Sequence, residues 1–252
     1  MIKETKKALR PVLKRIVQKL FPSAFSSCAD FEPYHNDIIR NVEKYTMTSP
    51  ERIFALIEAT KYITNKNIEG DIVECGIWRG GSVMAIIKTL QSLNTSNRQL
   101  LLYDTFDGMT EPTSIDVSRN GDIASTLLEN NKKTKEVHIW AYATLEDVKN
   151  NISSLNYPKE KVSFIKGRVE ETLPAQVPHS ISLLRLDTDW YKSTKHELTH
   201  LFPLLSPGGV LIIDDYGEWQ GAKKAVDEYL EENKIKILLN RIDHTGRIGI
   251  KL

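Results

Sequence analysis

Cysteine is scarce in this 252-residue sequence, which contains only Cys28 and Cys75. Two cysteines cannot form the disulfide framework of a small secreted protein, so a reducing cytoplasm is the expected compartment. The sequence also lacks an apolar run long enough to cross a membrane, and its first residues lack the apolar core of a secretory signal peptide. The formal net charge is only +1, which excludes a general polyanion-binding role, so we expect no nucleic-acid partner.

The most informative stretch of the sequence lies between residues 181 and 215. Two apolar runs, 181–186 and 210–213, are rich in Ile, Leu and Val, which is typical of strands buried on both faces of a parallel sheet. The residues between them are apolar at helical spacing, and Pro207-Gly208-Gly209 is expected to stop that helix. A strand, helix, strand unit brings both strand ends to one edge of the sheet, where open α/β sheets bind ligands.

Three aspartates follow these two predicted strands. Asp187 ends the first apolar run, and Asp214 and Asp215 end the second. Carboxylates held close together repel one another, and a hard divalent cation with oxygen ligands is the simplest way to offset that repulsion. We therefore predict a metal site at this edge. The alternative is that Asp214 and Asp215 cap the next helix or begin a turn.

A glycine-rich turn follows an earlier predicted strand, Asp71–Cys75. Gly76, Gly80 and Gly81 lie between that strand and a predicted helix over residues 82–90. Glycines allow a ligand to approach the backbone closely, and a helix start offers free N–H groups. The spacing is G-x-x-x-G-G, which differs from the dinucleotide fingerprint, and no P-loop lysine follows. Tight packing of the turn is the alternative interpretation.

Two more predicted strands extend the pattern of acidic strand ends. Residues 100–103 precede Asp104, and residues 162–165 precede Gly167-Arg168-Val169. Four acids thus end four different predicted strands, and parallel strands would place them along one edge of the sheet. These acids are Glu74, Asp104, Asp187 and Asp214.

The remaining chain is divided into an N-terminal helical appendage, residues 1–47, and an α/β domain, residues 48–252. Residues 1–20 predict a basic amphipathic helix that packs on its own domain or on a second subunit, with a membrane surface as the alternative. Ser49 and Pro50 predict the start of a helix. Residues 107–160 are expected to form a lid or substrate wall that includes a helix capped by Thr144. A helix over 219–232 and a hairpin of 235–239 with 247–252 complete the prediction.

Six stretches of this sequence resemble one known family in their order along the chain. They are YTMTSPER, GDIVECGIWRGGS, LLYDTFDGM, IKGRVEETLP, LRLDTDWYKST and LSPGGVLIIDDYG. The family is the macrocin O-methyltransferase-like group of S-adenosylmethionine-dependent, Mg-dependent O-methyltransferases. The resemblance implies a doubly wound, Rossmann-like sheet that is mostly parallel, with an antiparallel C-terminal strand and N-terminal helices.

The resemblance also implies roles for single residues. The methionine part of the cofactor would lie near Glu74, Gly76, Gly80, Gly81 and Ser82, and its ribose near Asp104 and Phe106. Gly167, Arg168 and Val169 would approach the adenine; Arg168 stands where the family commonly has an aromatic residue, and an arginine can also stack on a base. Asp187, Asp214 and Asp215 resemble the metal ligands, with Mg²⁺ as the usual ion.

The implied reaction moves a methyl group from S-adenosylmethionine to a hydroxyl on a sugar of a glycoside, natural product or saccharide. Metal coordination lowers the pKa of such a hydroxyl, and a base must take its proton. Asp187 is the first choice for that base and Asp189 the second. A homodimer formed through the N-terminal segment is expected.

Three other interpretations fit parts of the sequence. HELTH, residues 196–200, matches the zinc-protease pattern H-E-x-x-H, but the helical repeat places His196 and His200 opposite the apolar face, in solvent. Asp187-Thr188-Asp189 resembles the D-x-D of metal-dependent glycosyltransferases, which would use a sugar nucleotide. A membrane-associated interaction module would rest on the basic N-terminus alone and would leave the acidic strand ends unexplained.

Overall fold

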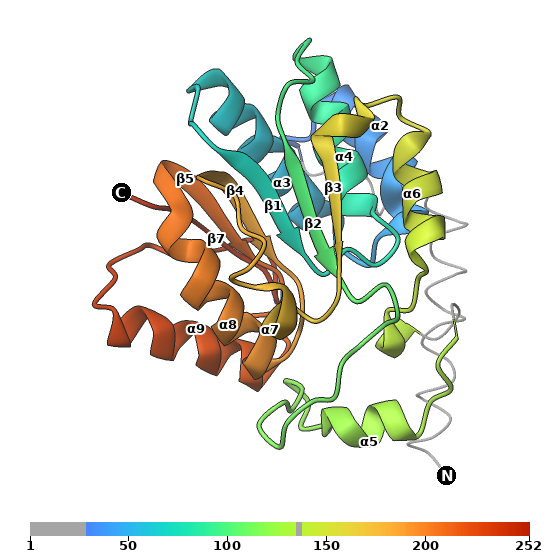
Figure 1. Ribbon diagram of the computed structural model, residues 1–252, viewed down its shortest axis with the longest axis vertical. Coiled ribbons are helices and arrows are strands. Elements are labelled where there is room, and N and C mark those ends of the chain that lie inside the picture. Colours follow the sequence, from blue (N-terminus) through green and yellow to red (C-terminus); the bar gives the residue numbers. More distant parts are fainter. Residues whose placement is uncertain (1–28, 135–137) are drawn as a thin grey trace. The chain divides into compact units, whose positions relative to one another are not determined.

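The computed structural model describes residues 29–134 and 138–252, and it divides into two compact units, residues 1–37 and 38–252. The second unit contains a seven-stranded sheet in the order β3-β2-β1-β4-β5-β7-β6 (Figure 1). The strands are β1 Asp71–Cys75, β2 Leu100–Asp104, β3 Val162–Lys166, β4 Ile181–Leu186, β5 Leu205–Ile213, β6 Asn240–Arg241 and β7 Arg247–Ile250. The predicted basic helix over residues 1–20 lies outside the described residues.

The sheet is parallel from β3 to β5 and antiparallel beyond it. β1 pairs in parallel with both β2 and β4, while β7 pairs antiparallel with β5 and with β6. Because strand order reverses direction at β1, the carboxyl ends of β1 and β4 flank the switch point where such sheets bind ligands. The predicted doubly wound sheet, mostly parallel with an antiparallel last strand, is confirmed.

Helices cover both faces of the sheet. In Figure 1, α3, α4 and α6 lie on one face and α7, α8 and α9 on the other. The α-helices are α2 Pro33–Val42, α3 Pro50–Asn65, α4 Gly81–Ser92, α5 Ala124–Glu129, α6 Leu145–Ser153, α7 Val169–Thr172, α8 Tyr191–Leu201 and α9 Gln220–Glu232. None of these described helices is long and apolar enough to span a bilayer.

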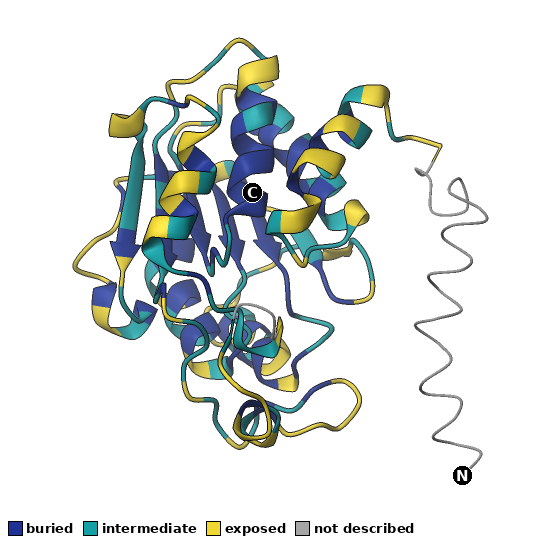
Figure 2. Cartoon of the chain, turned by 90° about the vertical axis from the view of Figure 1, so that its right-hand side faces the viewer, coloured by how far each residue is buried: buried dark blue, intermediate teal, exposed yellow. Residues whose placement is uncertain are grey.

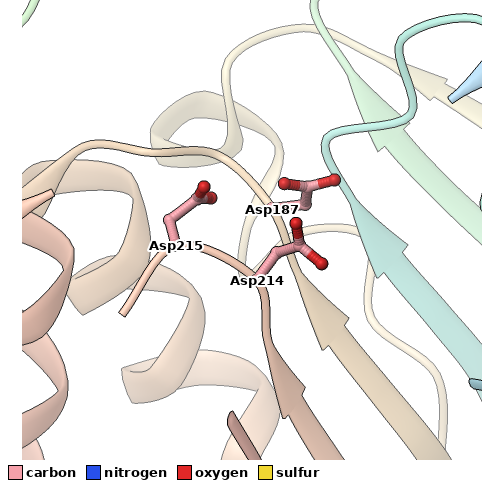
Figure 3. Close-up of side chains that lie close together, drawn as sticks. All are labelled: Asp187, Asp214 and Asp215. Carbon is pink, nitrogen blue, oxygen red and sulfur yellow. The ribbon is translucent and has the colours of Figure 1, made fainter. Parts of the chain in front are cut away.

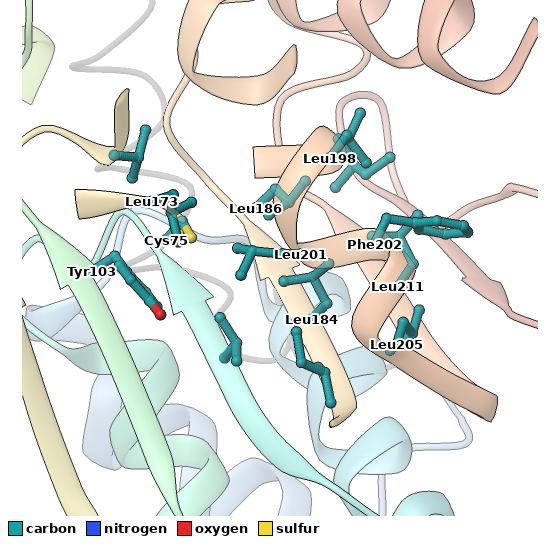
Figure 4. Close-up of a cluster of buried hydrophobic side chains, with 14 of the residues drawn as sticks. Cys75, Tyr103, Leu173, Leu184, Leu186, Leu198, Leu201, Phe202, Leu205 and Leu211 are labelled. Atoms are coloured by element: carbon teal, nitrogen blue, oxygen red, sulfur yellow. The ribbon is translucent and has the colours of Figure 1, made fainter. Parts of the chain in front are cut away.

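One apolar cluster of the described residues lies between the sheet and α8 (Figure 4). All six residues of β4 are buried, which explains why four of them are Ile or Leu. The other two are Ser182 and Arg185. The burial colours of Figure 2 show the same arrangement, with buried strands inside and exposed outer faces on the helices. The predicted apolar face of α8 is confirmed, since Leu198 and Leu201 are fully buried in this cluster.

Two predicted helix starts are confirmed by their capping bonds. The Ser49 hydroxyl accepts the Arg52 N–H at 3.2 Å, and Pro50 is the first residue of α3. The Thr144 hydroxyl accepts the Asp147 N–H at 3.2 Å at the start of α6. In both cases a side-chain oxygen satisfies an N–H that has no partner inside its helix.

Two boundaries differ from the prediction. β5 begins at Leu205, so Pro207-Gly208-Gly209 lies inside a strand, and α8 ends earlier, at Leu201. The Gly208 N–H donates to the Lys251 carbonyl, which shows that the end of the chain pairs with this segment. The predicted strand over 235–239 is wrong: Ile235, Ile237 and Leu239 pack against the core, and ladder pairing starts only at β6.

The predicted lid, residues 107–160, contains two different parts. α6 packs against the start of α4: a Cβ added at Gly80 would lie 3.3 Å from the Ile152 side chain. Residues 105–134, hereafter the arm, carry α5 and lie beyond the carboxyl ends of the parallel strands in Figure 1. A second, smaller apolar cluster joins the arm to the domain through Ala124, Leu128, Trp190, Trp219 and Ala222.

Candidate active site

A cavity of about 430 Å³ opens at the carboxyl ends of the parallel strands. Its walls come from the turns that follow β1 to β5, from residues 45–48 before α3, and from the arm. Most of the residues predicted to bind a cofactor or a metal line it. They are Glu74, Gly76, Gly81, Ser82, Asp104, Gly167, Arg168, Val169, Asp187, Asp189, Asp214 and Asp215.

Two of the predicted cofactor residues do not line the cavity. Gly80 faces α6, where an added Cβ would lie 3.3 Å from Ile152. The Phe106 ring is buried against Phe164, with the ring centroids 6.2 Å apart. Phe106 nevertheless contributes through its backbone, because its N–H donates to Asp104 at 2.6 Å.

Three carboxylates converge at one end of the cavity (Figure 3). Asp187, Asp214 and Asp215 each offer an oxygen, and these oxygens lie within 4.8 Å of one another. Backbone bonds hold the strand ends in place: the Asp187 N–H donates to the Cys75 carbonyl, and the Asp214 N–H to the Leu186 carbonyl, both at 2.9 Å. The parallel pairing of β1, β4 and β5 therefore builds the cluster that the sequence predicted.

Two arginines compensate part of this negative charge, and the sequence analysis missed both. Arg185 is fully buried, and its guanidinium lies 2.7 Å from Glu74, 2.8 Å from Asp187 and 2.7 Å from Asp214. Arg52, from the first turn of α3, pairs with Asp214. Arg185 could have been noticed, because a charged residue inside a strand predicted to be buried on both faces requires a buried partner. The position of Arg52 depends on tertiary packing alone.

The residues present fit a hard divalent cation. Asp215 Oδ2 is buried and has no hydrogen-bond partner among the described residues. Burial raises the pKa of both Asp187 and Asp215 well above the ordinary value, and neighbouring carboxylates add to the effect. Three carboxylate oxygens in a half-buried site are the donors that Mg²⁺ prefers. Within the described parts of the chain, no other group of three His, Cys, Asp or Glu side chains is placed to hold a metal.

Asp189 lies beside this cluster in an unusual conformation. Its φ of 65° is in the left-handed region, which non-glycine residues seldom adopt. The Trp219 indole N–H donates to Asp189 Oδ1 at 2.7 Å. Burial, with a smaller contribution from the charge of Asp187, raises the pKa of the Asp189 carboxyl to about 8.

Asp104 organises the opposite end of the cavity. Its Oδ2 accepts the N–H groups of Ile77 at 2.6 Å and Trp78 at 3.1 Å, and its Oδ1 accepts the Phe106 N–H. The carboxylate therefore fixes the turn after β1 against the turn after β2. Both turns line the cavity, so this acid holds that wall in place whatever it binds.

Gly76 is required by the close approach of two strand ends. It has a φ of +83°, and an added Cβ would lie 1.9 Å from the carbonyl oxygen of Asp187. We expect Gly76→Ala to lower the free energy of unfolding by about 3 kcal/mol or more, because it combines backbone strain with a backbone clash. Urea denaturation followed by circular dichroism measures this loss.

Gly121→Ala is the matched control for Gly76→Ala. Gly121 also has a positive φ, of +87°, but an added Cβ would meet nothing within 4 Å. Its expected loss is only the strain of a left-handed alanine, about 1–2 kcal/mol. Equal losses for the two variants would show that the contact with Asp187 costs nothing.

The HELTH motif does not form a zinc site. Glu197 is fully buried and accepts a hydrogen bond from the Thr188 hydroxyl at 2.9 Å. His196 and His200 contact each other, with ring centroids 4.4 Å apart, and are half-buried rather than in solvent as predicted. The reason is that His196 lies against α7, where its Nε2 is 3.2 Å from the Leu173 carbonyl oxygen.

Comparisons with known proteins agree with this geometry. The chain matches the family described as Macrocin-O-methyltransferase (TylF) over residues 30–248. It is 30% identical over 202 residues to demethyldecarbamoylnovobiocin O-methyltransferase of Streptomyces niveus, covering 80% of this chain and 74% of that one. Identity and coverage are the same for 8-demethyl-8-(2,3-dimethoxy-α-L-rhamnosyl)-tetracenomycin-C 4′-O-methyltransferase of Streptomyces olivaceus.

A solved structure extends the likeness to the fold. The O-methyltransferase NovP superposes with a TM-score of 0.71 at 28% identity, over 96% of this chain and 98% of that one. The residues matched by the family, 30–248, contain β1 to β6, the first two residues of β7 and all three residues of the acidic cluster. The chain therefore belongs to the macrocin-O-methyltransferase (TylF) family, and it is an O-methyltransferase.

Proposed function

We propose that this enzyme moves a methyl group from S-adenosylmethionine to a sugar hydroxyl of a glycoside, natural product or saccharide, with Mg²⁺ held at the acidic cluster. The observation that carries the proposal is the convergence of Asp187, Asp214 and Asp215 in the cavity that the predicted cofactor residues also line. The names of two relatives support the acceptor class, since one is named for demethyldecarbamoylnovobiocin and the other for a rhamnosyl tetracenomycin.

The donor end of the cavity is assigned to the turns after β1, β2 and β3. Gly81 and Ser82 lie at the start of α4, whose first N–H groups have no partner inside the helix. Asp104 stands at the end of β2, the position from which an acid receives ribose hydroxyls in nucleotide-binding α/β folds. Arg168 lines the adjoining wall and offers a planar guanidinium that can stack on adenine.

The acceptor end is assigned to the acidic cluster and its surroundings. A Mg²⁺ ion held by Asp187, Asp214 and Asp215 would lower the pKa of an acceptor hydroxyl and fix its position. Arg185 and Arg52 keep two of these carboxylates, Asp187 and Asp214, in place through their ion pairs. Met109 and Thr110 of the arm line the same cavity, so the arm is where acceptor selectivity would reside.

Asp189 is the better candidate for the base, although the sequence favoured Asp187. Asp187 Oδ2 is already paired with Arg185, and Asp187 belongs to the metal cluster. Asp189 is not one of the three clustered carboxylates, forms no ion pair among the described residues, and presents Oδ1 to the Trp219 indole N–H at 2.7 Å. We propose that Asp189 takes the acceptor proton on Oδ2.

Calorimetry with S-adenosylhomocysteine and, separately, with UDP tests the donor. Binding of S-adenosylhomocysteine without binding of UDP is expected; binding of UDP alone would point to a sugar-nucleotide donor and contradict the proposal. Incubation with S-adenosylmethionine and a panel of glycosides, read by mass spectrometry, tests the acceptor. Methylation of non-sugar hydroxyls only would contradict the acceptor class.

Compartment and assembly are also proposals. The use of only two cysteines, of which Cys75 is buried and free, favours the cytoplasm. A homodimer formed through the N-terminal segment, rather than contact of residues 1–20 with a membrane surface, is the expected assembly. Light scattering of the full chain and of a version lacking residues 1–20 would distinguish a dimer from a monomer.

A further inference from the structure

Asp189 is held from the side of the arm as well as from the sheet. Trp190 and Trp219 each stand immediately before a helix, α8 and α9, and their rings pack edge to face with centroids 4.9 Å apart. Both rings are buried in the small apolar cluster that also contains Ala124 and Leu128 of α5. The tryptophan pair therefore contacts the proposed base, Asp189, and also packs against α5 of the arm.

Polar bonds fasten the arm to the same turn. The Trp190 indole N–H donates to the Thr110 carbonyl at 3.0 Å. Asp116 of the arm is fully buried, and its Oδ1 accepts the N–H of Tyr191, the first residue of α8, at 2.8 Å. The other Asp116 oxygen accepts the Thr113 N–H at 2.6 Å, so Asp116 is itself fixed within the arm.

The arm also pairs with the residues around Trp219. The Arg119 N–H donates to the Glu218 carbonyl at 2.7 Å, and the Gln220 N–H donates to the Val117 carbonyl at 2.9 Å. Trp219 is therefore held through its neighbours by the arm, while its own indole N–H holds Asp189 Oδ1. Asp189 has a left-handed φ, which is a strained conformation, and we infer that the contacts of Trp190 and Trp219 with the arm keep its backbone from relaxing.

We propose that Trp219 is a positioning residue that couples the seating of the arm to the direction of the Asp189 carboxylate. The proposal rests on the proposed function, in which Asp189 is the base and the arm forms the acceptor wall. An acceptor that contacts Met109 and Thr110 would contact the arm, and the arm packs against Trp219, which orients the Asp189 carboxylate. Acceptor contacts remote from the reacting hydroxyl thereby help to align the base, which is how remote binding raises turnover.

Trp219→Phe tests the coupling, because phenylalanine keeps a six-membered aromatic ring near Trp190 and removes the five-membered ring that carries the N–H. We expect kcat to fall about 10- to 100-fold, part of the contribution of a well-placed base. KM for S-adenosylmethionine and the affinity for S-adenosylhomocysteine should stay unchanged. Thr89→Val is the control: the buried Thr89 hydroxyl donates to the Ala85 carbonyl at 2.8 Å within α4, Thr89 does not line the cavity, and the variant should keep wild-type kcat.

A double-mutant cycle with Asp189→Asn separates positioning from general damage. If Trp219 acts through Asp189, Trp219→Phe should lower kcat little further once Asp189 is replaced. An equal fall in both backgrounds, or a Trp219→Phe enzyme as active as Thr89→Val, would overturn the coupling while leaving the proposed function intact. Full activity of Asp189→Asn itself would remove the base and overturn both proposals.

Discussion

Asp215→Asn is expected to reduce methyl transfer on the order of 10³-fold while leaving the free energy of unfolding nearly unchanged. Of the three clustered carboxylates, Asp215 is the one that forms no ion pair with Arg52 or Arg185, and its Oδ2 is buried without a described partner. An asparagine at this position keeps the shape but supplies a neutral ligand, so the loss falls on cation binding.

Titration with Mn²⁺ or Mg²⁺ by calorimetry measures that loss directly, without the reaction. Asp227→Asn is the control, because Asp227 lies on α9 away from the cavity, and the variant should keep wild-type affinity. Thermal unfolding with and without a chelator adds a second comparison: the cation should stabilise the wild type and not Asp215→Asn. Wild-type activity that survives a chelator would remove the metal from the mechanism.

Arg185→Met is expected to lower the free energy of unfolding by about 3–5 kcal/mol, the usual cost of removing one partner from a buried ion pair. The methionine would fill similar space, but Glu74, Asp187 and Asp214 would lose the guanidinium that contacts all three. Denaturation in urea measures the loss. Arg119→Met, which removes an exposed pair with Glu218, should cost less than about 1 kcal/mol.

The loss in Arg185→Met should also depend on pH. Burial already raises the pKa of Glu74 to about 7 with Arg185 present, and removing the arginine raises it further. When the pKa of a carboxyl is higher in the folded than in the unfolded state, the free energy of unfolding falls as pH rises through the folded-state pKa. The gap between variant and wild type should therefore be wide at about pH 8 and narrow at about pH 5. A gap that does not change with pH would show that the arginine acts through packing.

The strands were predictable because polar residues or glycines directly follow their apolar runs. β1 and β4 have the predicted ends, since every side chain of β4 is buried and polar residues follow at once. The start of β5 was not predictable, because Pro207 and Gly208 look like a helix stop and only the pairing with Lys251 makes them part of a strand.

The convergence of the acids was predictable, and their neutralisation was not. Parallel strands with acidic ends must bring those acids to one edge, so Asp187, Asp214 and Asp215 follow from topology. Strands β1 to β5 lie between Arg52 and Asp214 along the chain, and no local sequence pattern connects the two residues. The role of Trp219 was hidden for the same reason: it faces Asp189 only because the arm and two helix starts meet there.

Asp243 links the turn between β6 and β7 to the start of α3. Its carboxylate accepts the Ser49 hydroxyl at 2.8 Å, lies 3.0 Å from the Arg52 guanidinium, and receives the N–H groups of Thr245 and Gly246. Arg52 in turn pairs with Asp214, so the turn between β6 and β7 supports the acidic cluster through a single arginine. A substitution in that turn would therefore loosen Arg52 and, through it, Asp214, although the turn supplies no carboxylate to the cluster.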